Sequence, residues 1–342
     1  MDKSVILAVA GSGKTTHLVN SLDTDKRFLI ITYTINNVSN LRSRIAEKFQ
    51  CLPQNIYLVS YFNFLYSFCY KPTLHYKIGA KGINFEPCKN RFAMGINRYR
   101  DTAFHLYSNR LAKLIDEQGA MGEVLERISK YFDYVFVDEV QDFAGHDFNF
   151  LKSILAADTN VVCVGDYFQH TFDTSRDGPV NRTLHDDFAS YKKQFKKIGV
   201  EVDEETLKKS HRCSPTVCNY VSENLGIQIH SSRMDETTIS FIEKQSDADD
   251  IFSEEGIVKL FYQDRAKYPG HARNWGETKG EDRYKDVCVV LNPTTLKSFK
   301  DNNLANLNSQ TRNKLYVALT RAKGDIHFVP ETLLKKYKST SS

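Results

Sequence analysis

Short runs of apolar residues, rich in Val and Ile, recur along the first part of the chain, and each is followed by a stretch with helical spacing. These runs lie at residues 5–9, 28–32, 56–59, 134–137 and 161–164. Continuous apolar runs of this length are typical of strands buried on both faces, as in a parallel sheet that helices cover. The pattern therefore predicts an α/β fold.

A second set of apolar runs follows a polar stretch near residues 195–206. Its members lie at residues 239–242, 257–261, 287–291 and 326–329. Since a single core rarely grows beyond about 250 residues, a chain of 342 residues has room for two. We predict one parallel-sheet lobe over residues 1–200, with a small insertion at about 71–125, and a second lobe over residues 201–342.

Composition narrows the class of protein. With 41% hydrophobic and 26% charged residues the chain is an ordinary globular protein, and its net charge of +4 permits a polyanionic partner without requiring one. Seven cysteines, an odd number with no C-x-x-C pair, disfavour a disulfide framework or a zinc site. This cysteine usage, together with a start segment that lacks a leader pattern, leads us to expect a reducing, cytoplasmic location. No window of 18 apolar residues is present, so we expect no membrane segment.

The first apolar run leads into A-V-A-G-S-G-K-T at residues 8–15, the phosphate-binding (P-loop) pattern with Ala in the first Gly place. Gly11 and Gly13 let the backbone curl so that its N–H groups face phosphates. Lys14 then reaches the β and γ phosphates and the Thr15 hydroxyl ligates Mg²⁺, so the expected ligands are a nucleoside triphosphate and Mg²⁺. The flanking strand and helix disfavour the alternative of a plain glycine-rich turn. The predicted nucleotide-binding residues are Gly11, Ser12, Gly13, Lys14, Thr15 and Thr16.

Two carboxylates follow the apolar run at residues 134–137. The carboxyl ends of strands are where α/β sheets bind ligands. Asp138 suits coordination of Mg²⁺ through water, and Glu139 suits a general base that orients the attacking water. A solvated acidic loop is the alternative, and a P-loop upstream disfavours it.

The D-E-x-Q-D sequence at residues 138–142 resembles motif II of the UvrD/Rep/PcrA-like helicases of superfamily 1 rather than the corresponding boxes of superfamily 2. Further segments resemble motifs of that family in the same order, so that the likeness runs from residue 8 to residue 322. They are T-Y-T at 32–34, S-Y-F-N-F at 60–64, V-G-D-Y-F-Q at 164–169, L-K-K-S-H-R at 207–212, T-K-G at 278–280 and K-L-Y-V-A-L-T-R-A at 314–322. The resemblance implies two RecA-like lobes of a P-loop NTPase with an ATP cleft between them.

The resemblance also implies catalytic roles outside the P-loop. Gln169 would sense the γ-phosphate, Arg212 would contact phosphate from the second lobe, and Arg321 would act as the arginine finger. Because both arginines belong to the second lobe and Lys14 to the first, hydrolysis would be coupled to lobe closure. His211 stands where the family has a Tyr that stacks on adenine, and we add it to the cofactor-binding residues. The predicted catalytic residues are Lys14, Glu139, Gln169, Arg212 and Arg321.

Contacts with nucleic acid are implied by the T-Y-T, S-Y-F-N-F and T-K-G segments. Bases would stack on aromatic rings, and backbone phosphates would meet N–H groups and cations. For each ring, ordinary core packing is the alternative. The predicted contact residues are Thr32, Tyr33, Ser60, Phe64, Phe172 and Lys279.

Together with the resemblance, these residues predict an ATP hydrolase and DNA helicase of superfamily 1, acting on single-stranded DNA in the 3′ to 5′ direction. The family's usual insertions, which help to engage and split duplex, are reduced here, so translocation is favoured over processive unwinding. The alternative is a helicase-like regulatory or sensor ATPase that controls a partner such as a nuclease, in a phage or a defence system. A kinase or GTPase-like switch that shares only the P-loop would not explain Gln169 and Arg321.

Overall fold

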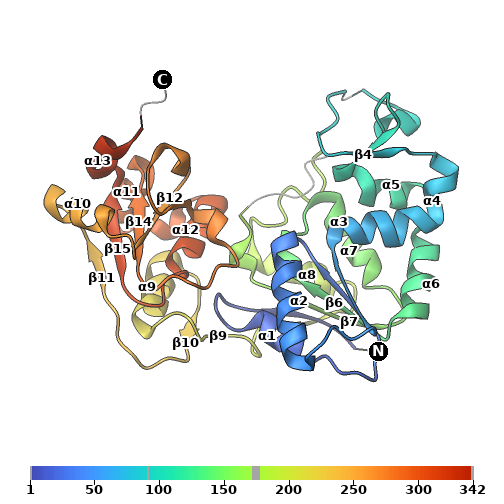
Figure 1. Ribbon diagram of the computed structural model, residues 1–342, viewed down its shortest axis with the longest axis horizontal. Helices are drawn as coiled ribbons and strands as arrows, with labels where there is room; N and C mark the ends of the chain where they lie inside the picture. Colours follow the sequence, from blue (N-terminus) through green and yellow to red (C-terminus); the bar gives the residue numbers. More distant parts are fainter. Residues whose placement is uncertain (1, 91, 172–177, 340–342) are drawn as a thin grey trace. The chain divides into compact units, whose positions relative to one another are not determined.

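The computed structural model describes residues 2–90, 92–171 and 178–339. The chain forms two compact units, seen in Figure 1. The first comprises Met1–Leu7, Lys14–Gly165 and Phe172–Asp203, and the second comprises Ala8–Gly13, Asp166–Thr171 and Glu204–Ser342. Two short segments of the N-terminal half thus pack with the C-terminal half. The predicted lobe boundary between residues 200 and 201 stays a prediction.

The first unit is built on a six-stranded sheet in which every strand pair is parallel, in the order β3-β2-β6-β7-β1-β8. The strands are β1 Lys3–Leu7, β2 Phe28–Thr32, β3 Ile56–Ser60, β6 Tyr134–Asp138, β7 Asn160–Gly165 and β8 Glu201–Asp203. Five of them coincide with the predicted apolar runs to within two residues. The sixth, β8, is a short and mostly polar edge strand that pairs with β1, so its sequence carries no apolar signal.

Helices connect these strands, as a parallel sheet requires. They are α1 Lys14–Asn20, α2 Ile35–Phe49, α5 Leu111–Glu117, α6 Met121–Tyr131, α7 Gly145–Ile154 and α8 Phe188–Lys196. Side-chain caps fix where two of them begin. Thr34 accepts a hydrogen bond from the Asn37 amide (3.2 Å) at the start of α2, and Asp187 accepts from the Ser190 amide at the start of α8.

The stretch between β3 and α5 has a structure of its own, at the end of the unit farthest from the N-terminus (Figure 1). Its elements are α3 Tyr61–Asn63, the π-helix η1 Phe64–Tyr70, α4 Lys71–Ile78, β4 Gly82–Asn84, the 3-10 helix η2 Gly95–Arg98, β5 His105–Tyr107 and the 3-10 helix η3 Ser108–Arg110. Strands β4 and β5 pair in parallel. π-helical segments are rare and are frequently found at functional sites.

The second unit holds a five-stranded sheet, again parallel throughout, in the order β11-β15-β14-β12-β13. The strands are β11 Ile239–Phe241, β12 Val258–Phe261, β13 Ala272–Asn274, β14 Val287–Leu291 and β15 Ile326–Pro330. The short strands β9 Lys209–Ser210 and β10 His230–Ser231 pair separately. The helices are α9 Pro215–Leu225, α10 Gln245–Ser253, α11 Pro293–Lys300, α12 Ser309–Leu319 and α13 Glu331–Leu334. Two parallel sheets confirm the predicted α/β fold class.

The central strand β14 shows why strands of the second sheet could be predicted from apolar runs in the sequence. Val287, Val289 and Leu291 pack into one hydrophobic core, while Cys288 and Val290 pack into another on the opposite face. A strand buried on both faces needs an unbroken apolar run. Among the described helices of either unit, none is long and apolar enough to cross a membrane.

We expect the Arg27–Asp133 pair, which joins the amino ends of β2 and β6, to stabilise the first unit in a pH-dependent way. The Arg27 guanidinium lies 2.8 Å from the Asp133 carboxylate and lowers the pKa of Asp133 to about 2. An unfolded Asp has a pKa near 3.9, so the contribution to the free energy of unfolding is full above about pH 4 and is lost as the pH falls through about 2.

Urea unfolding of wild type and Arg27→Ala measures this contribution. The variant should be less stable at neutral pH, and the difference should shrink as the solution is acidified from about pH 4 towards about pH 2. The control Arg42→Ala changes an exposed arginine of α2 and should show no such trend. A difference that does not vary with pH would contradict the role of the pair.

Candidate functional site

The phosphate-binding loop joins β1 to α1 at the carboxyl edge of the first sheet. Gly11 and Gly13 have φ values of 71° and 84°, in the left-handed region that glycine enters without steric cost. Lys14 begins α1 and is largely buried, and the buried Ser12 hydroxyl has no hydrogen-bond partner within the described part of the chain. A curled loop at a helix start with an unsatisfied buried hydroxyl fits a bound phosphate group.

The two threonines after Lys14 differ in their surroundings. Thr15 is half-buried in the first turn of α1, whereas Thr16 is exposed and its hydroxyl accepts a hydrogen bond from the Arg44 guanidinium (3.0 Å). Thr15 is therefore the better placed of the two to meet a ligand held by the loop.

Segment Ala8–Gly13 packs closely against the stretch that carries Arg212, and both belong to the second unit. The Val9 amide donates to the Leu207 carbonyl (3.1 Å), and the His211 amide donates to the Gly11 carbonyl (2.9 Å). A Cβ at Gly11 would lie 2.6 Å from the Arg212 Cβ. Only glycine fits at this position, for reasons of space as well as of backbone conformation.

The predicted carboxylates stand at the carboxyl end of β6, at the same edge of the sheet as the start of α1. Asp138 ends the strand and is buried. Glu139, also buried, has a φ of 56°, a left-handed conformation that is costly for a residue with a side chain. The Gln141 side-chain amide donates to its carboxylate. Neighbouring contacts thus hold Glu139 in a strained but defined position.

Gly165 supports this arrangement from the adjacent strand β7. A Cβ at Gly165 would overlap the Gln141 Oε1 and would lie 2.9 Å from the Val140 amide nitrogen. The absence of a side chain at Gly165 therefore makes the space in which Gln141 reaches Glu139.

Gln169 lies in the 3-10 helix η5 Tyr167–Gln169, directly after β7. It is buried, and its side-chain amide donates to the Asp166 carboxylate (2.8 Å). Asp166 also caps this turn, because its other oxygen accepts from the Phe168 amide (3.1 Å). The predicted γ-phosphate sensor is thus held by a buried carboxylate three residues earlier.

Both predicted arginines contact the loop at residues 278–282, which contains the T-K-G segment. Arg321 is only 1% exposed and donates to the carbonyl oxygens of Thr278 (3.2 Å) and Glu281 (3.0 Å). Arg212 forms an ion pair with Asp282 and donates to the Thr320 carbonyl (3.0 Å). The second unit therefore gathers the two cations at one place, while the predicted contact of each with nucleotide stays a prediction.

His211 lies beside the phosphate-binding loop, since its main-chain amide donates to the Gly11 carbonyl. Its side chain is exposed, and the ring Nδ1 is 2.8 Å from the Ser232 hydroxyl. An exposed imidazole next to the phosphate-binding loop can stack on a flat group.

The predicted nucleic-acid contacts fall into two classes. Thr32 and Phe64 are fully buried, and Phe64 stacks on Phe68 with ring centroids 5.4 Å apart, which is the core packing given above as the alternative. Ser60 is buried and caps α3. Tyr33 and Lys279 are half-buried, and Phe172 lies outside the described residues. The contact roles of all six stay predictions.

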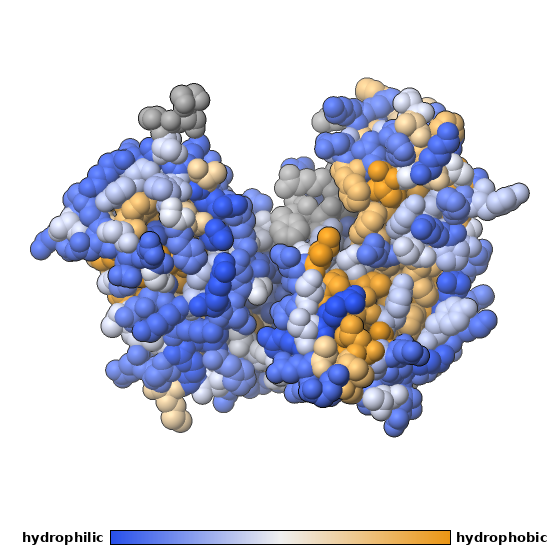
Figure 2. Space-filling model, in the orientation of Figure 1, coloured by the Kyte–Doolittle hydropathy of each residue, from blue (hydrophilic) through white to orange (hydrophobic). Residues whose placement is uncertain are grey.

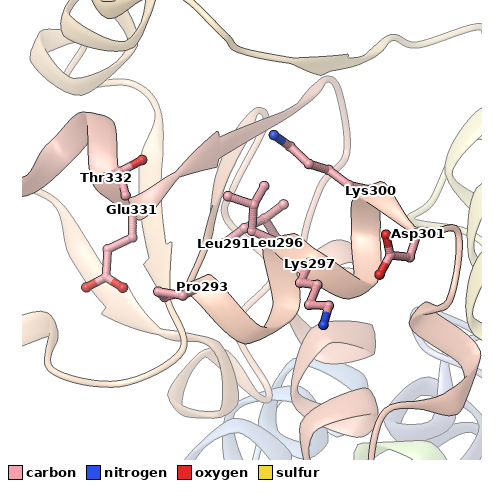
Figure 3. A pocket seen from close by; sticks show the side chains of 8 residues that line it. All are labelled: Leu291, Pro293, Leu296, Lys297, Lys300, Asp301, Glu331 and Thr332. Carbon is pink, nitrogen blue, oxygen red and sulfur yellow. The ribbon is translucent and has the colours of Figure 1, made fainter.

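A separate hollow of about 320 Å³ lies in the second unit, at the carboxyl ends of β14 and β15 (Figure 3). Its lining residues are Leu291, Pro293, Leu296, Lys297, Lys300, Asp301, Glu331 and Thr332. None of the predicted site residues is among them, so the hollow is distinct from the features described above.

The sequence alone did not reveal several partners of the site residues. Asp282 lies 70 positions after the arginine that it binds, and no spacing rule connects the two. Tyr316 is part of the K-L-Y-V-A-L-T-R-A segment, yet only its arginine received a role. The i, i+4 spacing of Phe62 and Tyr66 could have indicated an aromatic pair on one helical face.

We expect Gly165→Ala to destabilise the first unit by about 1–3 kcal/mol, because the new methyl group overpacks the space used by Gln141. The matched control is Gly122→Ala in α6, where an added Cβ meets open space and where Ala is favoured over Gly by up to about 1 kcal/mol. Urea unfolding curves of the two variants should move in opposite directions. Equal stabilities would contradict the close approach at Gly165.

Solved structures of arterivirus helicases are similar to the chain at low identity. The complex of Arterivirus nonstructural protein 10 (helicase) with DNA is 16% identical with a TM-score of 0.49, over 95% of this chain and 60% of that chain. The PRRSV helicase is 15% identical with a TM-score of 0.48, over 99% of this chain and 55% of that chain. The chain thus spans 55–60% of the length of these two helicases. No curated protein matches the sequence.

A family model described as the viral superfamily 1 RNA helicase core domain matches residues 96–330. The matched region includes the acidic strand end, Gln169, both predicted arginines and the T-K-G segment, and it covers more than half of the chain. It confirms the prediction of superfamily 1, and it does not single out the UvrD/Rep/PcrA-like branch. The chain therefore belongs to the family of viral superfamily 1 RNA helicase core domains.

Proposed function

We propose that the chain hydrolyses ATP with Mg²⁺ and uses the energy to move along single-stranded nucleic acid. The observation that carries this proposal is the strained and buried Glu139 at the same sheet edge as the start of α1, where the phosphate-binding loop ends. The direction proposed is 3′ to 5′, after the UvrD/Rep/PcrA-like branch that the motifs resemble. Lobe closure around ATP is part of the same proposal.

The first unit supplies the groups for metal-assisted hydrolysis. Lys14 would neutralise charge on the β and γ phosphates, while Thr15 and Asp138 would hold Mg²⁺. When bound, Mg²⁺ supplies positive charge against the phosphate oxygens. Glu139 would accept a proton from the attacking water, and its burial with Gln141 beside it fixes the direction of its carboxylate.

The second unit supplies positive charge for the transition state. Arg212 and Arg321 are held near each other by the loop at residues 278–282. Fixed cations directed at a developing negative charge accelerate phosphoryl transfer without reorganisation. Because Lys279 lies in the same loop, binding of nucleic acid there offers a route by which the polymer would influence both arginines.

The chemistry of the stretch after β3 supports a nucleic-acid partner. Residues 71–110 contain eight Lys or Arg and two Asp or Glu, a net charge of +6, whereas the whole chain carries +4. Apolar patches lie among hydrophilic ones at this end of the first unit (Figure 2). Cations interleaved with exposed aromatic rings favour binding to single strands.

A series of rings leads from this stretch to the S-Y-F-N-F segment. Phe85 is 71% exposed, and its ring centroid lies 5.2 Å from that of Phe62. Phe62 stacks on Tyr66 at 5.9 Å, and the Lys71 ammonium lies 4.9 Å from the Tyr66 ring. An exposed ring backed by further rings and a cation is suited to stacking on a base. We include RNA beside DNA as a polymer, since the description of the family names RNA.

We expect Lys14→Ala to lower ATP turnover by about 10²-fold or more, because the phosphates lose a fixed cation. Glu139→Gln should still bind ATP with Mg²⁺ but hydrolyse it poorly. A coupled ATPase assay and equilibrium binding of nucleotide measure the two effects. The control Lys197→Ala removes an exposed lysine after α8. Near-normal turnover in Lys14→Ala would contradict the site, and lost nucleotide affinity in Glu139→Gln would contradict a role as base.

We expect single-stranded polymer to raise ATP turnover by about tenfold or more, the size of a typical coupling between two sites. The assay compares single-stranded DNA, single-stranded RNA, duplex DNA and no polymer. Equal turnover in all four would contradict a translocase and favour the regulatory ATPase that controls a partner such as a nuclease. Displacement of a blocking protein from the 5′ end, and not from the 3′ end, tests the direction.

Replacing Lys71, Lys77 and Lys81 together by Ala tests the basic stretch in a binding assay with the same polymers. Affinity for single strands should fall, and the slope of log affinity against log salt should drop by about 0.7 for each phosphate that the variant no longer neutralises. The control variant replaces Lys193, Lys196 and Lys197, three lysines at the end of α8. Equal reductions in affinity in the two variants would mean that net charge alone matters.

A further inference from the structure

Helix α12 contacts the segment that contains Gln169 through one of its faces. Three side chains on this face follow one another at intervals of three residues, which places them above each other on a helix. The Asn313 amide donates to the His170 carbonyl (3.0 Å), and the Gln310 amide donates to the Thr171 carbonyl (3.5 Å). The third of these side chains is Tyr316, which reaches the Asp166 carboxylate.

The Tyr316 hydroxyl makes two hydrogen bonds, one as acceptor and one as donor. It accepts from the Ala10 amide (2.9 Å) and donates to the Asp166 Oδ2 (3.0 Å). All three residues have an exposed fraction of 0%. Burial, and then the charge of Asp166, raise the pKa of Tyr316 well above its usual value. The hydroxyl therefore stays protonated and donates a hydrogen bond to the carboxylate.

Asp166 extends this connection to the predicted γ-phosphate sensor. The same Oδ2 atom accepts from the Gln169 side-chain amide (2.8 Å). A continuous path of buried hydrogen bonds thus runs from the backbone of the phosphate-binding loop at Ala10, through Tyr316 and Asp166, to Gln169. Ala10, Asp166, Gln169 and Tyr316 all belong to the second unit.

We infer that Tyr316 is a positioning residue for ATP hydrolysis, whose hydroxyl holds the phosphate-binding loop and Gln169 in one fixed arrangement. The inference rests on the proposed function, since it concerns how the groups around the γ-phosphate are kept in place. This positioning role belongs to the hydroxyl and not to the ring. The ring packs separately against Phe168, with centroids 6.1 Å apart. A phenylalanine would retain this packing and leave the buried Ala10 amide without its acceptor.

The effect of removing this connection falls on turnover more than on binding. Most of the loop's hold on a nucleotide would come from its other N–H groups and from Lys14, whereas the Tyr316 hydroxyl bonds to Ala10 and Asp166. Misplacement of a catalytic group by a fraction of a bond length is enough to slow the chemical step. A change in kcat at nearly constant KM is the signature of an interaction that acts in the transition state.

The experiment compares Tyr316→Phe with Tyr262→Phe in the full chain. Tyr262 is a matched control because its hydroxyl contacts Thr311 on the same helix (3.4 Å) and is not part of the path to Ala10. Steady-state ATP hydrolysis should show kcat lowered about tenfold or more in Tyr316→Phe, with KM within about threefold. Hydrogen exchange should rise in residues 8–13 and 166–171 of that variant and stay unchanged in the control.

A second variant, Asp166→Asn, tests the same connection without changing the size of a side chain. It removes the charge of the carboxylate that accepts hydrogen bonds from Tyr316 and Gln169. If both residues act through one connection, the double variant loses about as much kcat as either single variant. Multiplied losses would show independent effects and overturn the inference.

The remaining outcomes also test the positioning role of Tyr316. Unchanged kcat in Tyr316→Phe, or a loss that lies wholly in KM, overturns the positioning role. Increased exchange throughout the chain, with no excess in the two segments, means that Tyr316 acts only on stability and overturns it as well. A wild-type chain that hydrolyses no ATP with any polymer contradicts the proposed function instead. The exchange comparison then still decides whether Tyr316 holds the loop at Ala10.

Discussion

Two main-chain hydrogen bonds tie the phosphate-binding loop to the stretch that carries Arg212, and the position of Arg212 beside the loop depends on them. They join Val9 to Leu207 and His211 to Gly11. Main-chain bonds leave little freedom, because donor and acceptor are both fixed by the backbone. The missing side chain at Gly11 is what allows this approach. Contacts within the second unit therefore help to determine the shape of the loop.

The same unit provides hydrogen-bond and ion-pair partners for two guanidinium groups that are largely buried. A buried charge without partners is very costly. Arg321 meets carbonyl oxygens of the loop at residues 278–282, and Arg212 meets Asp282 from the same loop. Both cations are stabilised by groups that phosphate oxygens would have to replace. Movement of this one loop would alter the surroundings of both arginines together, and under the proposed function this would link nucleic acid to hydrolysis.

Local patterns in the sequence predicted the parts of the fold that local physics determines. Strands such as β14 are buried on both faces and therefore require a continuous apolar run. The P-loop can be recognised in the sequence because its glycines and its lysine occupy fixed positions in the motif. The edge strand β13, Ala272–Asn274, and the π-helix η1 gave no such signal. Nor could spacing reveal that Tyr316 contacts Ala10, since the two lie 306 positions apart. Long-range partners arise from the fold as a whole.

Each half of the proposed site is organised within its own unit. In the first unit the left-handed Glu139 is kept in place by Gln141, and Gly165 leaves the space for that contact. In the second unit the hydrogen bonds of Tyr316 fix the phosphate-binding loop relative to Asp166. Strain and buried polar contacts of this kind are maintained at a cost in stability, and that cost is met during folding. Under the proposed function, these groups would need little reorganisation when a nucleotide binds, which is the condition under which fixed charges lower a barrier most.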